Sequence, residues 1–360
     1  MKCIALNTLA VLAVLPAGRT VVAQTTWTAT LEAESEPSLP IGRVVNLVVD
    51  SQLKVYVNDG YLDGIAVLAP NLTFEQEIGR KGEGPGEFDW PTSIQILAGD
   101  SLFVFDGGLA RVTVFEPYAR TVAHTATLPA INNPSRLWKL PGQRGYVGSR
   151  WLPFYATQRE EDQGRSEVVF RLGRDGNPEA DSLFAFPAAE RLVVRGEGSV
   201  MVGPHPFGGE SFLRLLGADR LVHANSRVPS VVVLDLTGSV QHSFAVPATP
   251  VPVSAAELSG AIEREEHDAF VRVLRQGAPH MWPALTGLAV DDEQRIWVGG
   301  RSESGSDEWE WTAFTQEGRK VGSVMLPAGF VVHAVRDGRL FGVFNDELDV
   351  PHIRAYRLVR

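Results

Sequence analysis

The segment "IGRKGEGPGEFDWP", residues Ile78 to Pro91, is the stretch of the chain that looks most like a phosphate-binding loop. Such loops hold an anion with consecutive backbone N–H groups, and in a P-loop Lys-Ser or Lys-Thr follows. Here Pro85 has no N–H, neither dipeptide follows, and Glu83 and Glu87 place negative charge where the anion would sit. The composition therefore argues against phosphate binding.

A structural role explains the same loop better. Gly84 and Gly86 permit backbone angles that are closed to other residues, and Pro85 between them stiffens the turn. Phe88 is expected to plug the space between neighbouring sheets, while Glu87 accepts backbone N–H groups or pairs with a nearby arginine. We therefore interpret this segment as a linker.

A second chemical candidate lies on a predicted helix. Ser254 with Glu257 forms a capping box at its start, and Gly277 ends it, so one helix is expected in an insertion over about 253–277. Glu263 and His267 stand four residues apart and could share one face. No third ligand occurs at zinc-like spacing, so a solvated charged face is favoured and no metal site is predicted.

Other catalytic patterns are missing from the sequence. There is no Gly-x-Ser-x-Gly elbow. The only cysteine, Cys3, lies in the predicted signal peptide, so the mature chain has no thiol for catalysis or disulfides. The sequence thus contains no evident catalytic machinery, and we expect a protein that is not an enzyme.

Aromatic side chains gather in three segments, "RWLPFYATQ", "PHMWPA" and "DEWEWT". They could form an apolar rim that binds a sugar, a peptide, another small molecule or a partner protein, or they could anchor loops to the fold. Both interpretations are given equal weight. The candidate ligand-binding residues are Trp151, Phe154, Tyr155, His280, Trp282 and Trp309.

The N-terminus has the features of a secretory signal. A basic start is followed by an apolar stretch from Ile4 to Leu15 and by small residues up to Ala23, which predicts a signal peptide over 1–23. No segment is long enough to span a membrane. We expect a secreted or periplasmic monomer.

The charge of the chain excludes one class of partner. The formal net charge is −10, and removing residues 1–23 takes away Lys2 and Arg19 but no acid, which leaves −12. Binding to nucleic acid through bulk charge is therefore not expected.

A repeated unit of three apolar strands positions these candidates. It is clearest from Val44, Thr92 and Leu285, weaker from Arg220 and Phe330, and degenerate over Arg136 to Pro187. The second strands end at Asn58, Asp106, Arg150, Asn225, Gly300 and Asn345. Most intervals are about 45 residues, the length of a propeller blade, and the two longer ones indicate insertions. The sequence predicts an all-β, six-bladed propeller of four-stranded blades in a single domain over 24–360.

Closure of the ring can also be predicted. The last unit supplies three strands, and "TWTATLEAE" at Thr26 to Glu34 is an isolated alternating strand. Pairing of this N-terminal strand with the last strands completes the final blade and removes two exposed edges.

The segment Gly79 to Phe115 resembles the repeat of NHL-type six-bladed propeller proteins, through its Gly-Pro-Gly-Glu-Phe linker and its Arg-Val-x-Val-Phe strand. Enzymatic six-bladed relatives, such as gluconolactonase-type proteins, hold calcium in the central channel. The resemblance thus implies an alternative function, a metal-assisted hydrolase or lyase. Apart from calcium under this alternative, no cofactor is predicted.

Loop length indicates the working face. In a four-stranded meander, the loops after the second and fourth strands emerge on one face. These loops are long, and they include 78–91, 150–166, 187–198, 247–283 and 299–308, whereas turns on the opposite face are tight. We therefore predict a non-catalytic protein that binds a ligand or partner on the long-loop face.

Overall fold

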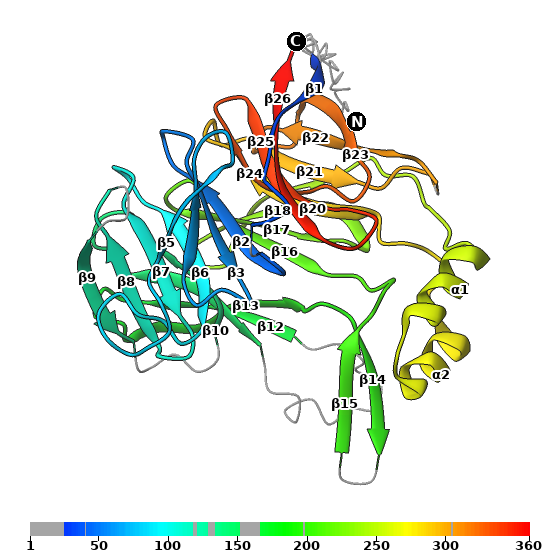
Figure 1. The fold of residues 1–360 in the computed structure, drawn as a ribbon, viewed down its shortest axis with the longest axis horizontal. Coiled ribbons are helices and arrows are strands. Elements are labelled where there is room, and N and C mark those ends of the chain that lie inside the picture. Colours follow the sequence, from blue (N-terminus) through cyan, green and yellow to red (C-terminus); the bar gives the residue numbers. More distant parts are fainter. Residues whose placement is uncertain are drawn as a thin grey trace, which may run out of the picture.

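The chain folds as a β-propeller, with sheets arranged around a central axis (Figure 1). The computed structural model describes residues 25–39, 41–117, 121–128, 134–151, 166–196, 199–303 and 305–360. The predicted signal peptide lies outside these ranges. The prediction of an all-β propeller is confirmed.

Four antiparallel sheets have four strands each, and each sheet follows the chain order. The first contains β2 (Val44–Val49), β3 (Val55–Asp59), β4 (Ile65–Leu68) and β5 (Phe74–Ile78). The second contains β6 (Pro91–Ile96), β7 (Leu102–Asp106), β8 (Arg111–Phe115) and β9 (Val122–Thr127). The third contains β10 (Pro134–Lys139), β11 (Tyr146–Trp151), β12 (Ser166–Leu172) and β13 (Pro178–Pro187). The fourth contains β16 (Ser211–Leu216), β17 (Arg220–Asn225), β18 (Val228–Asp235) and β19 (Val240–Ala245).

The N-terminal strand joins the remaining strands into one eight-stranded sheet. Its members are β20 (Leu285–Val290), β21 (Ile296–Gly300), β22 (Glu308–Phe314), β23 (Lys320–Pro327), β1 (Thr25–Glu34), β26 (Pro351–Val359), β25 (Arg339–Asn345) and β24 (Val331–Arg336). β1 pairs in parallel with β23 through Thr25 to Trp27, then antiparallel with β26 from Thr28 onward. The predicted pairing of the N-terminal strand with the last strands is confirmed.

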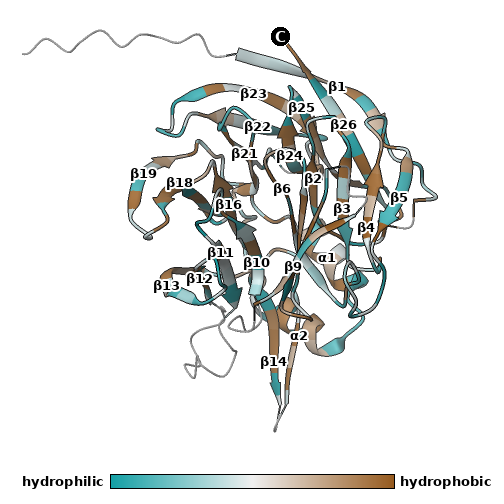
Figure 2. Cartoon of the chain, turned by 90° about the vertical axis from the view of Figure 1, so that its left-hand side faces the viewer, coloured by the Kyte–Doolittle hydropathy of each residue, from teal (hydrophilic) through white to brown (hydrophobic). Residues whose placement is uncertain are grey.

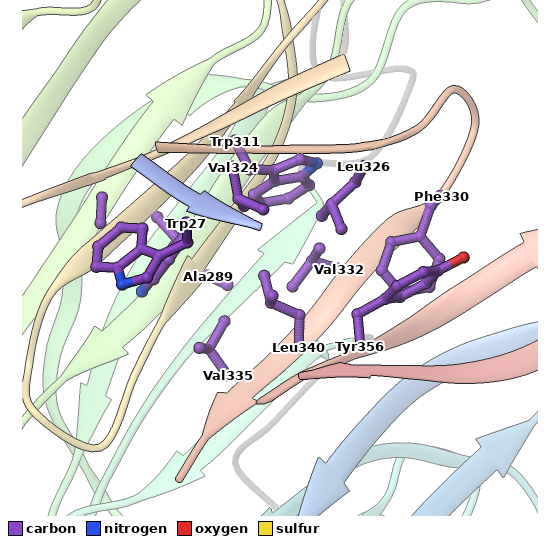
Figure 3. Close-up of a cluster of buried hydrophobic side chains, with 12 residues drawn as sticks. Trp27, Ala289, Trp311, Val324, Leu326, Phe330, Val332, Val335, Leu340 and Tyr356 are labelled. Carbon is purple, nitrogen blue, oxygen red and sulfur yellow. The ribbon is translucent and has the colours of Figure 1, made fainter. Parts of the chain in front are cut away.

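The core is divided among the spaces between neighbouring sheets. Tyr56 of β3 packs with Val104 of β7, for example, and a separate cluster joins β20–β23 to β24–β26 through Trp311 and Leu340 (Figure 3). Inner strands are therefore apolar on both faces: β3 and β7 are buried along their whole length. Outer strands such as β5 are largely exposed and hydrophilic (Figure 2).

The glycine-rich segment is a linker between two sheets, as predicted. Phe88 is 1% exposed and its ring lies 6.1 Å from that of Phe115. The Glu87 carboxylate accepts the backbone N–H of Gly84 at 2.8 Å and pairs with Arg80 at 2.7 Å. Gly86 has a φ of 78°, which only glycine adopts easily, whereas Gly84 is not among the residues with positive φ.

The large insertion holds two helices, so the prediction of one inserted helix is wrong. α1 (Ala255–Arg264) begins with the predicted capping box of Ser254 and Glu257, and α2 is Asp268–Gly277. Glu265 ends α1 in an extended conformation, and its carboxylate accepts the backbone N–H of His267 at 3.0 Å. This side-chain bond replaces a helical one, so the chain turns between the two helices.

The other insertion forms a hairpin that the sequence analysis missed. β14 (Arg191–Gly196) and β15 (Ser199–Pro204) make a two-stranded sheet that projects from the ring beside α2 (Figure 1). Phe270 and Leu274 of α2 pack on Leu192 of the hairpin. The two insertions thus bury each other's apolar side chains, although they are separated by β16–β19 in the sequence.

Candidate functional site

The central channel is lined by the first strands of the sheets, β2, β6, β10, β16, β20 and β24. Neighbouring first strands run side by side, β24 with β2, β2 with β6, β6 with β10, β16 with β20 and β20 with β24. β10 and β16 pack less closely than these pairs. The channel wall is therefore loosest between β10 and β16.

Two adjoining cavities open where these first strands begin, which is the long-loop face. One has a volume of about 400 Å³ and is lined by Val45, Pro91 and Pro134 near the strand starts. The other, of about 440 Å³, lies between β10 and the β14–β15 hairpin. Arg136, Trp151 and Glu167 line both. We call these two cavities together the channel mouth.

Register shifts at the beginning of the first strands shape this mouth. β2, β6, β10 and β20 each carry one at their second residue, and β24 carries one at its third residue, His333. A bulge leaves one residue out of the ladder and redirects its side chain. The residues skipped in this way include Ser135 and His333, which both line the first cavity.

Two arginines dominate the charge of the channel. Arg136 comes from β10 and Arg214 from β16, and both line the first cavity. Within the described ranges, Nη1 of Arg136 is buried without a hydrogen-bond partner, and Nη1 of Arg214 donates only to the carbonyl of the preceding Leu213, at 3.0 Å. Burial, with the charge of Arg136 nearby, lowers the pKa of Arg214 to about 10. Neither guanidinium is paired with a carboxylate in the described part of the chain.

The carboxylates of the mouth form no ion pair with these two arginines in the described part of the chain. Glu167 is 4% exposed, and its Oε1 accepts hydrogen bonds from Ser149 Oγ at 2.5 Å and from Ser135 Oγ. Glu210 lines the second cavity, and loss of hydration there raises its pKa even though arginines lie nearby. Glu167 is thus occupied by hydroxyl groups, and Glu210 is easier to protonate than an ordinary glutamate.

Two histidines near the channel are held neutral. Burial lowers the pKa of His333 to about 4, and Arg214 adds to this effect. Burial also lowers the pKa of His223 to about 4, against the influence of Glu167. At neutral pH the cations of this region are therefore arginines.

Tryptophans form the apolar part of the mouth. Trp90, Trp138 and Trp151 all line the first cavity. Trp90 and Trp151 are 56% and 44% exposed, so their rings are available at the rim, whereas Trp138 lies deeper in the channel and also lines its opposite end. The mouth thus combines buried positive charge with aromatic surface.

The predicted site residues are divided among several places. Trp151 lies in the channel mouth. Phe154 and Tyr155 fall outside the described residues. His280 is exposed in the loop after α2, and its backbone carbonyl accepts the N–H of Val253 at 2.9 Å.

Trp282 and Trp309 are brought together around one arginine. The Arg301 guanidinium lies between their rings, 3.9 Å from the centroid of Trp282 and 4.4 Å from that of Trp309. Trp282 Nε1 donates to Glu257 of α1 at 3.1 Å, and its ring meets Phe207 at 4.8 Å. This stack attaches the helical insertion to the sheets.

The sequence analysis overlooked Arg136 and Arg214 as functional candidates. Arg214 interrupts the largely apolar first strand "SFLRLL", in the same way as Asn46 in "VVNLVV" and His333 in "VVHAVR". A charged residue inside such a strand was the available signal for Arg214, whereas the strand of Arg136, "PSRLWK", also contains Ser135 and Lys139 and gave no such signal.

Calcium does not fit the channel mouth. This ion takes six to eight oxygen ligands. Here the two carboxylates of the lining, Glu167 and Glu210, lie beside Arg136 and Arg214, whose charge opposes a cation. Within the described ranges, no group of three or more His, Cys, Asp or Glu side chains is placed to hold a metal ion.

Comparison with known proteins identifies the fold and no narrower family. No protein-family model matches the chain, and no curated protein is significantly similar to it. A solved structure of a Bacteroides fragilis protein described as exported is 13% identical, with a TM-score of 0.50, and the match covers 95% of this chain and 98% of that one. Virginiamycin B lyase from Staphylococcus aureus is 10% identical, with a TM-score of 0.45 and coverage of 92% and 100%.

A protein described as a gluconolactonase is 13% identical, with a TM-score of 0.43 and coverage of 93% and 94%. At these identities, the first match supports a shared fold and nothing about activity. No helix in the described part of the chain is long and apolar enough to cross a membrane.

Proposed function

We propose that this protein is an exported, six-bladed β-propeller of the NHL type that binds a small molecule in the channel mouth without catalysing a reaction. The eight-stranded sheet counts as two blades, because β20–β23 and β24–β26 with β1 each repeat the four-strand order. The signal-like start of the sequence supports export. We propose that the chain acts as a monomer.

One observation carries the proposal: the two cavities of about 400 and 440 Å³ adjoin at the face where the long loops gather. Their sizes are those of typical small-molecule sites, which combine apolar walls with a few convergent polar groups. Among the described residues, Trp151 is the predicted aromatic residue that lines these cavities, and it supports this proposal. Trp282 and Trp309 have a supporting role in this proposal, since they pack around Arg301.

The alternative, a metal-assisted hydrolase or lyase, is less well supported. Arg136 and Arg214 place positive charge in the channel, where such an enzyme would hold its metal ion. Metal analysis of the purified protein separates the two functions, followed by addition of calcium or zinc in a thermal-shift assay. Bound metal, or stabilisation by either ion, would favour the enzyme.

A variant that blocks the cavity tests small-molecule binding. Val45 lines the first cavity and is 39% exposed, so Val45→Trp should fill the cavity without disturbing the core. Val240→Trp is the matched control, because Val240 is 60% exposed on the outer strand β19. Compounds from a small-molecule library that raise the melting temperature should lose their effect in Val45→Trp and keep it in Val240→Trp. Equal effects in both variants would place binding elsewhere.

A further inference from the structure

Arg136 and Arg214 differ from Arg227 and Arg295, which are held by carboxylates. Arg227 is held by Glu190, with nitrogen-to-oxygen distances of 2.8 and 2.6 Å. Arg295 is held by Asp291 at 2.6 Å. The two channel arginines lie close enough for Arg136 to lower the pKa of Arg214, yet no carboxylate in the described part of the chain pairs with either.

Unpaired charges of like sign inside a protein are costly. A guanidinium that leaves water without a partner loses hydration free energy, and a second one nearby adds repulsion. The buried Nη1 of Arg136 has unmet hydrogen-bonding capacity in the described structure. A fold keeps such an arrangement when a ligand supplies the missing partner, and the partner of two cations is an anion.

The charge of the whole molecule makes this local excess more informative. Arg43 and Arg191 also line the mouth, so four arginines face Glu167 and Glu210. The chain as a whole carries −10. A cleft of positive charge in an acidic protein concentrates small anions at the cleft.

We infer that the ligand of the channel mouth is a small organic anion, whose acidic group is bound by Arg136 and Arg214. This inference rests on the proposed function and adds the class of ligand. The acidic group, a carboxylate, phosphate or sulfonate, takes charge-assisted hydrogen bonds from the guanidinium groups. The apolar body of the ligand lies against Trp138 and towards the exposed rings of Trp90 and Trp151.

A pair of matched probes tests this inference on the full-length mature protein. The probes are 8-anilinonaphthalene-1-sulfonate, an aromatic anion, and N-phenyl-1-naphthylamine, the same ring system without the sulfonate. Both are titrated by fluorescence at neutral pH with folded protein. We expect saturable binding of the sulfonate at one site, and clearly weaker binding of the neutral probe.

The variants Arg136→Gln and Arg214→Gln are each expected to weaken sulfonate binding at least about tenfold, since each removes a charge-assisted contact. Arg319→Gln makes the same charge change on the exposed turn between β22 and β23 and should leave binding unchanged. Circular dichroism and melting temperature establish that each variant is folded. The two single variants are independent, so either folded one tests the inference.

Three results overturn the inference in distinguishable ways. Equal affinity for both probes, unchanged in the arginine variants but lost in Val45→Trp, would mean that the mouth binds neutral molecules, so the proposed function would stand and the anion class would be wrong. Sulfonate binding that survives Val45→Trp would remove the channel mouth as the site and would contradict both. Lack of saturable sulfonate binding would also reject the anion class.

Discussion

The turn after β20 and the channel mouth differ in whether their charged side chains are paired. At the turn, Asp291 is 3% exposed and accepts from Arg295 Nε at 2.6 Å, from Trp297 Nε1 at 2.7 Å and from the backbone N–H of Arg295 at 2.7 Å. In the mouth, Arg136 and Arg214 have no such partner in the described structure. Charge that is fully hydrogen-bonded holds the fold together, whereas charge left unpaired is available to a ligand.

The same turn recurs after β2, on the tight-turn face of the ring, which lies opposite the channel mouth. Asp50, after β2, accepts the backbone N–H groups of Gln52 and Lys54 at 2.9 Å and the hydroxyl of Tyr56 at 3.1 Å. Its backbone repeats too, since Leu53 and Gln294 both have a φ of 64°. The tight-turn face is therefore built for stability, and substitutions there should affect folding before they affect binding.

The largest effect is expected from Asp291→Ala. The substitution leaves Arg295, the indole N–H of Trp297 and backbone N–H groups without their acceptor, so we expect a loss of about 3–5 kcal/mol in the free energy of unfolding. Urea denaturation of the variant and the parent protein measures this loss. Asp292→Ala is the control, because Asp292 is exposed and accepts one backbone N–H, and it should cost less than about 1 kcal/mol. Similar losses in both variants would contradict a stabilising role for the buried aspartate.

Trp282→Ala should have the next largest effect. The change removes the contact with Phe207 and one side of the Arg301 stack, so a loss of about 2–3 kcal/mol is expected. Thermal unfolding and limited proteolysis of residues 253–277 measure the loss. Trp90→Ala removes a ring that is 56% exposed at the mouth. It should weaken binding of the sulfonate probe and leave the melting temperature nearly unchanged. If the two variants exchanged these effects, the ligand would lie against Trp282.

Acid should destabilise the protein through its neutral histidines. The pKa of His333 is about 4 in the fold and 6.5 in the unfolded chain, so the unfolded state binds a proton first as the pH falls. The contribution of His333 to the free energy of unfolding is therefore complete above about pH 6.5 and is lost as the pH falls from 6.5 to 4. We expect this loss to be about 1–2 kcal/mol. Melting temperatures from pH 7 to 4.5 should fall less steeply in His333→Gln. His242→Gln, at an exposed position, should follow the parent protein.

The smallest expected effect on the free energy of unfolding is a gain, whereas the other substitutions cause a loss. Arg214→Gln removes a cation that is desolvated and repelled by Arg136, so the free protein should become more stable by about 0.5–1 kcal/mol. Urea denaturation without ligand measures the gain. A loss of more than about 1 kcal/mol would show that Arg214 supports the fold instead.

The sequence predicted the parts of the fold that repeat. Val, Ile, Leu and Phe at regular intervals identified the sheets, and the second strands end where predicted to within one residue, as at Asn58 and Asp106. The β14–β15 hairpin was missed because it is a single copy in a long insertion. The break between α1 and α2 depends on the Glu265 side chain, which helical periodicity does not reveal.

The site was harder to predict than the scaffold. Aromatic residues in loops drew attention to Trp282 and Trp309, although their partner Arg301 is visible only in three dimensions. Arg136 and Arg214 are 78 positions apart in the chain and meet only because β10 and β16 begin neighbouring sheets. Proximity of this kind depends on how neighbouring sheets pack around the axis, which strand periodicity alone does not encode.

The position of β1 determines when the protein can finish folding. Its residues pair with β26, so that Glu32 contacts Arg357, 325 positions later. Sheets that pair locally, such as β2–β5, can form early, but the eight-stranded sheet must wait until the C-terminal strand is available. Contacts across such a distance slow folding. Until then the edge of β1 that pairs with β26 is unpaired, and a chaperone or a second unfinished chain can compete for it.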